Sequence, residues 1–444
     1  MSRLAGLAIA FVALACRADA REWIVGGAGA DFPLMGPAIA AASPRDVIRV
    51  RGGVYREDLV LDQPLAIRGE NGPVLFGTGV GSVITILANG CEISGLTIEG
   101  SGTGQTNEMD AAVQVRSSGN RVVDNRMRRV FYGVVVVDGS HNEIADNEIE
   151  GLRELPFGRR GDGIYLYRAP ENFVGRNRIS GERDAIYFQY AHRGRAVENV
   201  TSDSRYGLHD MFSDDTRIAR NTFAGSVVGA NIMNSRRIHV VGNRIQRNRG
   251  VPGVGLTLKD CDDSTIDGNL IIENARGLLL DGSSVNRLTA NTFRANDTAV
   301  TLFSSAERNA FSGNRFVDNW SDVVLSGADS GTQWSIDGRG NSWSRYRGFD
   351  FDGDGVGESA HPVVGAFERL EGNNPAARIF LQSPAAAGLE LAARLSETTL
   401  GQAVDPHPVV VATGSRSHAT AGWLVTAFAG LVVIFKRGGQ PWSR

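Results

Sequence analysis

Cysteine is nearly absent from this chain, with three residues among 444. Cys91 and Cys261 lie far apart in the body of the sequence, and no CxxC pair occurs, which excludes a disulfide framework and a paired-thiolate metal site. Positive charge is not in excess either, because the formal net charge is −3. That balance gives no electrostatic case for nucleic acid as a partner. Glycine is abundant instead, with 55 residues, and indicates many turns rather than long helices.

The first 20 residues have the features of an export signal. Arg3 precedes an apolar run from Leu4 to Ala15, and the segment closes on the small-residue pattern Ala18-Asp19-Ala20. We expect cleavage after Ala20 and export of the rest of the chain.

A second apolar run, AGWLVTAFAGLVVIFKR, lies near the C-terminus. Its roughly fifteen apolar residues are fewer than the about 20 that usually span a bilayer. Trp423 at one end and Lys436-Arg437 at the other resemble an aromatic anchor and a positive cytoplasmic flank. We therefore expect an inner-membrane anchor within residues 411–444, with a buried or interfacial helix as the alternative.

The middle of the chain is periodic. An Asn followed two residues later by an apolar residue recurs, most often every 22 residues, at Asn125, Asn147, Asn177, Asn221, Asn243, Asn269, Asn291, Asn314 and, less regularly, Asn199 and Asn341. Between these positions lie short alternating segments such as GVVVV, AIYFQ and GLTLK, which are too short for helices. The pattern predicts an all-β fold, a parallel β-helix with one repeat per coil. The general rule for crossovers between parallel strands makes this helix right-handed. The Asn column should lie at a turn, where its amides bond neighbouring coils and Asn tolerates a left-handed backbone.

These features predict four regions: a signal peptide (1–20), the β-helix (21–345), a short α or irregular cap (346–410), and a linker with the anchor (411–444). Two insertions, GLRELPFGRRGDG and QRNRGVPG, fall at the same corner of the coil and bracket three coils. Insertions that share one edge of a solenoid often mark its binding edge.

Alternation assigns the faces of the bracketed strands. The outward columns should read Tyr165, Tyr187, His209, Asn231, Thr257 and Tyr167, Gln189, Met211, Met233, Lys259. His209, Met211 and Met233 would then be exposed neighbours. Asp210 would point inward between Phe188 and Ile232, where a carboxylate is costly unless it is paired or neutral. Either a partner such as Arg205 or Arg183 is present, or the strand is locally irregular there.

Several blocks together resemble the NosD-type proteins: the export signal, the 22-residue coils with N-x-[FI], the segment YGLHDMFSDD, and the tail NSWSRYRGFDFDGDGVGE. The resemblance runs from about Asp46 to about Pro408, although Glu358 stands where the pattern has Asp. It implies a periplasmic, non-enzymatic accessory protein for building the copper centres of nitrous oxide reductase. Its implied partners are the membrane and ATPase subunits of an ABC transporter, a copper-chaperone lipoprotein and the apo-reductase.

The imidazole of His209 and the thioethers of Met211 and Met233 suit Cu(I), a soft ion that is passed on from an exposed site. The same face could instead contact a partner protein, because methionine and tyrosine suit adaptable interfaces. That contact patch would contain Tyr165, Tyr167, Tyr187, Tyr190 and His209.

The segment DFDGDGVGE resembles a calcium loop. Asp350, Asp352 and Asp354 stand at positions 1, 3 and 5, and Glu358 stands at position 9. Position 12 is His361, where such loops have a bidentate Glu. The alternative is a solvated Asp-Gly turn that closes the end of the solenoid.

Two further function classes stay open beside the copper role. Many β-helices are lyases or epimerases of acidic polysaccharides, and the set Tyr206, His209, Asp210, Asp214, Asp215 superficially resembles an epimerase pattern. Alternation places His209 and Asp210 on opposite faces, which argues against that use. The third class is a rigid docking scaffold that binds no metal.

Overall fold

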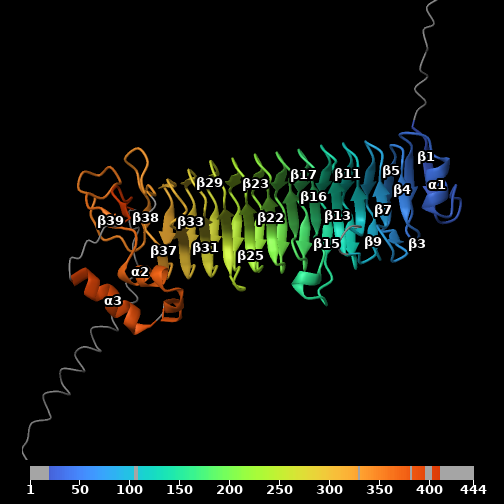
Figure 1. Ribbon diagram of the computed structural model, residues 1–444. Coiled ribbons are helices and arrows are strands. Elements are labelled where there is room, and N and C mark those ends of the chain that lie inside the picture. The colour runs from blue at the N-terminus through green and yellow to red at the C-terminus, as the bar shows by residue number, and fades with distance from the viewer. Residues whose placement is uncertain (1–19, 105–108, 329–330, 381–382, 396–402, 411–444) are drawn as a thin grey trace, which may run out of the picture.

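The computed structural model describes residues 20–104, 109–328, 331–380, 383–395 and 403–410. The expected signal peptide and the expected anchor in 411–444 lie outside these residues, apart from Ala20. Among the described residues, no helix is both long and apolar enough to cross a membrane. The prediction of a parallel β-helix is confirmed, because short strands stack coil upon coil into one rod (Figure 1).

Three long parallel sheets form the sides of the rod. The first contains β1 (Glu22–Val25), β2 (Val47–Val50), β5 (Ala66–Gly69), β8 (Glu92–Ser94), β11 (Arg121–Val123), β14 (Glu143–Ala145), β17 (Phe173–Gly175), β20 (Arg195–Val197), β23 (Arg217–Ala219), β26 (His239–Val241), β29 (Thr265–Asp267), β32 (Arg287–Thr289) and β35 (Ala310–Ser312). The second contains β4 (Leu59–Leu61), β7 (Ile84–Ile86), β10 (Ala111–Val115), β13 (Tyr132–Val137), β16 (Ile164–Tyr167), β19 (Ile186–Gln189), β22 (Tyr206–Met211), β25 (Val228–Met233), β28 (Val254–Lys259), β31 (Arg276–Asp281), β34 (Thr298–Phe303) and β37 (Ser321–Ser326). The third contains β3 (Val54–Arg56), β6 (Val74–Phe76), β9 (Thr97–Glu99), β12 (Arg126–Arg128), β15 (Glu148–Glu150), β18 (Arg178–Ser180), β21 (Val200–Ser202), β24 (Thr222–Ala224), β27 (Arg244–Gln246), β30 (Leu270–Ile272), β33 (Thr292–Arg294), β36 (Arg315–Val317) and β38 (Ser342–Trp343).

The recurring asparagines form a buried ladder along one corner of the rod. Asn199 donates its backbone N–H and its Nδ2 to Oδ1 of Asn221, over 2.9 and 3.0 Å. Asn221 repeats both bonds to Asn243, and the same pattern links the members from Asn125 to Asn341. The left-handed backbone falls one residue earlier than expected, for example at Glu198 and Arg220. The preceding residue therefore makes the turn, and the buried Asn is left to satisfy backbone groups of two coils.

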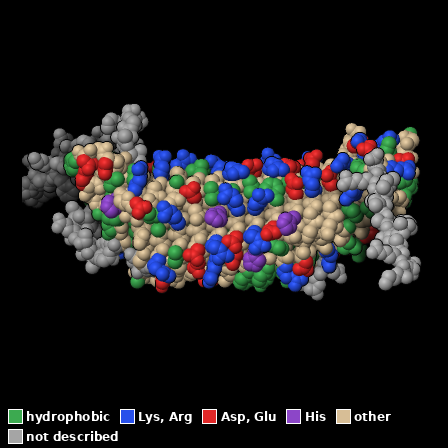
Figure 2. All heavy atoms as spheres, turned by 90° about the horizontal axis from the view of Figure 1, so that it is seen from above, with side chains coloured by type: hydrophobic (Ala, Val, Ile, Leu, Met, Phe, Trp, Pro, Cys, Tyr) green, Lys and Arg blue, Asp and Glu red, His purple; other side chains and the backbone are tan. Residues whose placement is uncertain are grey.

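Charged side chains also run in rows along the outside of the rod, with both signs interspersed (Figure 2). Arg121, for example, lies between Glu92 and Glu143 and makes a 2.9 Å contact with each. Such exposed pairs contribute little individually, about 0–1 kcal/mol. Because partners lie on neighbouring coils, the rows favour the observed stacking register.

Two caps close the ends of the core. Helix α1 (Met35–Ala41) covers the N-terminal coil, and the Glu57 carboxylate accepts the backbone N–H groups of Met35 and Gly36 at 2.8 Å each. At the other end lie α2 (Ala366–Asn373), the 3-10 helix η2 (Pro375–Phe380), α3 (Pro384–Leu395) and the antiparallel pair β39 (His361–Pro362) and β40 (Val404–Asp405). Helix α1 was not foreseen, because it lies outside the 22-residue period.

The C-terminal cap ends the asparagine ladder with a carboxylate. Oδ2 of Asp405 accepts the backbone N–H of Asn341 at 2.7 Å and the indole N–H of Trp343 at 2.9 Å. Asp405 is fully buried. The segment around it thus returns across more than 60 residues to take the place of one further coil.

Candidate functional site

The two outward columns lie on the second sheet, between the two insertions. His209 on β22 is in register with Tyr187 on β19 and with Asn231 on β25. Met211 is in register with Met233. The neighbour relations expected from the repeat are therefore present in the structure.

Exposure of these columns differs from the expectation. Tyr165, Tyr187 and His209 are only 7%, 9% and 8% exposed, whereas Met211 and Met233 are half-buried. The prediction that His209 stands exposed is wrong, because the coil spacing lets each ring cover the next. Ring centroids lie 4.9 Å apart from Tyr165 to Tyr187 and 4.4 Å apart from Tyr187 to His209.

The expected tyrosine contact patch is therefore divided. Tyr165 and Tyr187 belong to a buried cluster with Phe131 and Tyr132, which Leu152 of the first insertion helps to cover. Tyr167 is half-buried and Tyr190 is 41% exposed. A second, more accessible aromatic row thus remains at the surface, and the Tyr190 ring stacks on Phe212 at 5.0 Å.

The first insertion folds into a compact loop that contains the 3-10 helix η1 (Phe157–Arg159) and projects from the rod below β15 (Figure 1). The Arg160 guanidinium donates to the carbonyl oxygens of Leu155, Gly181 and Arg153. Beneath the loop, both carboxyl oxygens of Glu182 are buried and lack a hydrogen-bond partner among the described residues. Burial raises the pKa of Glu182 well above its ordinary value.

An acidic residue that the sequence did not single out holds His209 in place. Asp184, which is fully buried, has its Oδ2 3.1 Å from Nδ1 of His209. Arg205 donates to both Asp184 oxygens at 2.7–3.0 Å. Burial alone would raise the pKa of Asp184, but the hydrogen bonds from His209 and Arg205 outweigh it and lower that pKa.

The same ion pair occurs one coil earlier. Arg183 donates to both oxygens of Asp162 at 2.9 and 2.6 Å, and Asp162 is also fully buried. Burial and the nearby Asp184 charge raise the pKa of Asp162. The sequence contains a signal for these two pairs, because Asp162 and Asp184 stand 22 residues apart, each just before a strand of the second sheet. Arg183 and Arg205 repeat with the same spacing.

Asp210 points inward, as expected, between Phe188 and Ile232. The expected Arg partner is wrong, because Arg183 and Arg205 bind Asp162 and Asp184. Ser235 donates its hydroxyl to Oδ1 of Asp210 at 2.9 Å instead. Burial raises the pKa of Asp210 to about 8, so the side chain is largely protonated at neutral pH.

The donor set of this face fits a soft cation such as Cu(I). Nε2 of His209 is buried and has no hydrogen-bond partner among the described residues. The Met211 and Met233 thioethers lie on adjacent strands, and each accepts one weak hydrogen bond, from Tyr187 and Asn231 respectively. Thioether and imidazole donors are those that Cu(I) prefers.

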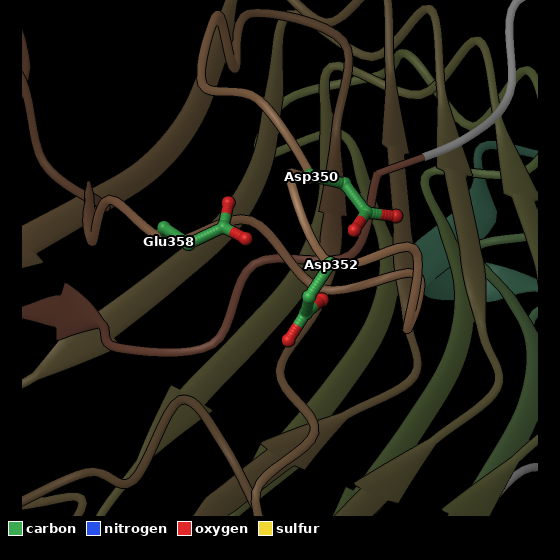
Figure 3. Close-up of side chains that lie close together, drawn as sticks. All are labelled: Asp350, Asp352 and Glu358. Atoms are coloured by element: carbon green, nitrogen blue, oxygen red, sulfur yellow. The ribbon is translucent and has the colours of Figure 1, made fainter.

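The acidic loop of the cap brings three of its four predicted ligands together. Ligand oxygens of Asp350, Asp352 and Glu358 lie within 4.8 Å of one another (Figure 3). Asp354 is not in this group, and the His361 ring packs against Trp343. Backbone N–H groups already occupy some oxygens, since Asp350 accepts from Gly353 and Gly355.

Sugar-cleaving chemistry finds less support in this arrangement. Asp162, Asp184 and Asp210 are all fully buried, and the guanidinium groups of Arg183 and Arg205 are bound to two of them. A lyase or epimerase of uronates needs a cation that is open to the substrate carboxylate, whereas Arg183 and Arg205 are each paired with a buried carboxylate of this chain.

Comparisons with known proteins match this chain both by fold and by sequence. The A-module of the mannuronan C-5 epimerase AlgE6 of Azotobacter vinelandii superposes with a TM-score of 0.51 at 13% identity, covering 70% of this chain and 93% of that chain. At that identity the likeness shows the fold alone.

Relatives by sequence are more informative. The chain is 31% identical over 401 residues to the "Probable ABC transporter binding protein NosD" of Pseudomonas aeruginosa, covering 85% of this chain and 93% of the relative. The protein of the same description from Stutzerimonas stutzeri is 31% identical over 381 residues, 82% of this chain and 86% of the relative. A family model described as "Periplasmic copper-binding protein (NosD)" matches residues 150–348, which include both insertions and β22. The chain therefore belongs to the NosD family.

Proposed function

We propose that this chain is a periplasmic, non-enzymatic accessory protein that takes up Cu(I) transiently for the copper centres of nitrous oxide reductase. The observation that carries the proposal is the face formed by His209, Met211 and Met233, where two thioethers in register lie beside an imidazole with an unpartnered nitrogen. Family membership supports copper as the cargo, since the family is described as copper-binding.

The proposed partners are the membrane and ATPase subunits of an ABC transporter, a copper-chaperone lipoprotein and the apo-reductase. The description of both relatives as ABC transporter binding proteins supports the first of these. The half-buried methionines and the exposed ring of Tyr190 offer an adaptable surface where a copper donor could dock. Export by residues 1–20 and an inner-membrane anchor in 411–444 would hold the rod beside such a transporter.

The test is an anaerobic Cu(I) titration of the full chain, comparing wild type with the triple variant His209→Asn, Met211→Leu, Met233→Leu. These substitutions keep the side-chain volumes close to the originals, so the stack and the strand register should survive. His239→Ala, an exposed histidine on β26, is the matched control. We expect the triple variant to lose one bound Cu(I) and the control to keep it.

Other outcomes would select the alternatives. Equal affinity and stoichiometry in wild type and triple variant would reject these ligands. Unchanged copper binding together with lost maturation of the reductase in cells would favour a docking scaffold. Turnover of alginate or pectin by the purified chain would establish an enzyme instead.

A calcium ion at the acidic loop is a separate proposal. The convergence of Asp350, Asp352 and Glu358 favours it. Since the loop supplies three close carboxylates and no bidentate Glu at position 12, the site would be weak. Its role would be to stiffen the cap at the end of the rod.

A further inference from the structure

The ring of His209 is held in one orientation by residues outside the proposed ligand set. Its Nδ1 lies 3.1 Å from Asp184, its face stacks on Tyr187, and the Tyr206 ring meets it edge-on with centroids 5.1 Å apart. Its other nitrogen, Nε2, is buried and without a hydrogen-bond partner among the described residues. An imidazole whose Nδ1 is held by a carboxylate and whose Nε2 has no partner is arranged to bind a ligand at Nε2.

The hydrogen bond between Asp184 and His209 has a defined direction. Arg205 donates to Asp184 over 3.0, 2.8 and 2.7 Å, and a carboxylate engaged in this way can only accept from a third group. Nδ1 of His209 must therefore carry the hydrogen. In the neutral ring, Nε2 then keeps its lone pair, which is the form of imidazole that binds a metal.

We propose that Asp184, itself held by Arg205, is the positioning residue that fixes His209 in the Nδ1–H tautomer and so makes Nε2 the copper ligand. The inference rests on the proposed function. Carboxylates that orient a ligating histidine in this way raise its basicity and keep the ring from turning away.

The repeat itself supplies a control for this role. One coil earlier, Asp162 and Arg183 form the same buried ion pair, but the ring that corresponds to His209 is that of Tyr187. Only the later pair touches an imidazole. The two pairs are neighbours, since Nε of Arg183 lies 4.0 Å from Oδ2 of Asp184 and Oδ1 of Asp162 accepts the backbone N–H of Asp184 at 3.1 Å. Loss of the earlier pair leaves the bond between Asp184 and His209 in place, whereas loss of the later pair removes it.

The test compares two double variants of the full chain, Asp184→Leu/Arg205→Met and Asp162→Asn/Arg183→Met. Leucine at position 184 offers no acceptor to His209, and asparagine at position 162 keeps the oxygen that accepts the backbone N–H of Asp184. Each removes both partners of one buried ion pair, which leaves no uncompensated charge. One readout is Cu(I) affinity, measured without oxygen by competition with a chromophoric Cu(I) chelator. The other is the set of ¹⁵N shifts of the histidine rings in copper-free protein, with the His209 signals identified by their absence in His209→Gln.

We expect Cu(I) affinity to fall about 10–100-fold in the Asp184 variant relative to the Asp162 variant. In the copper-free spectra, His209 should show the Nδ1–H tautomer in wild type and in the Asp162 variant and should lose it in the Asp184 variant. Equal affinities in the two double variants, or an Nε2–H tautomer in wild type, would overturn the inference. If His209→Gln binds Cu(I) as tightly as wild type, the proposed copper function itself fails; the copper-free spectra separate the two failures.

Discussion

The asparagine ladder leads to a quantitative prediction for the substitution Asn221→Ala. Asn221 accepts the buried backbone N–H of Asn199 at 2.9 Å and donates its Nδ2 to the carbonyl oxygen of Ala196 at 2.8 Å. Alanine leaves the Asn199 N–H without an acceptor, whereas the Ala196 carbonyl keeps its place in the parallel ladder of β20 with β23. An unsatisfied buried group costs about 1–3 kcal/mol, so we expect the free energy of unfolding to fall by about that amount.

The assay is equilibrium denaturation followed by circular dichroism, combined with hydrogen exchange of the fragment that contains Asn199. Because each coil contacts only its neighbours, exchange should rise first in the coils that contain Asn199 and Asn243 and much later near the two ends. Thr222→Ala changes the adjacent, half-buried position and leaves the ladder intact, which makes it the control. A loss below about 1 kcal/mol with an unchanged Asn199 amide would refute the reasoning.

Three further predictions concern other buried or clustered carboxyl groups. The pKa of Asp210 is raised to about 8 in the folded copper-free chain, whereas an unfolded Asp titrates near about pH 4. Between about pH 4 and about pH 8 the folded chain therefore holds a proton that the unfolded chain does not. Over this range wild type loses about 1.4 kcal/mol of folding stability for each pH unit. The stability margin of Asp210→Asn over wild type should thus widen from pH 5 to pH 8, and a margin that is constant with pH would contradict the pKa. Adding Ca²⁺ should raise the melting temperature of wild type but not that of Asp352→Asn, whereas equal responses would exclude the loop as the site. Asp405→Ala removes the acceptor for the Asn341 backbone N–H and the Trp343 indole, so the cap should open and be cleaved by proteases while the central coils stay resistant. An unchanged cleavage pattern would show that other contacts hold the cap.

Much of the fold follows from the 22-residue period, because a fixed repeat sets the register of every strand. The pairing of Met211 with Met233, the inward position of Asp210 and the asparagine column that bonds neighbouring coils were all predicted in this way. Burial of the outward column was not, since alternation describes one strand at a time and does not show that rings on successive coils cover each other.

The contact between Asp184 and His209 could not be predicted from the sequence, for a related reason. The two residues stand 25 positions apart, in different columns of neighbouring coils, so the 22-residue repeat does not align them. The caps could not be predicted from the sequence because they do not follow the 22-residue period. Helix α1, the β39–β40 pair and Asp405 have no repeated counterpart among the described residues. Single-copy elements leave no pattern to detect.

The closure of the ladder by Asp405 has a consequence for how the chain is made. Until residues 403–410 arrive, the backbone of Gly340 and Asn341 beside β38 lacks its partners, which are His407, Val409 and the Asp405 carboxylate. Such an open edge is a template for pairing with another chain. A protein that emerges from its N-terminus onward would finish every coil before it could seal this edge. The interval between the last coil and the seal is therefore the period of greatest exposure to misassembly, and a chaperone that acts on this protein would be needed there most.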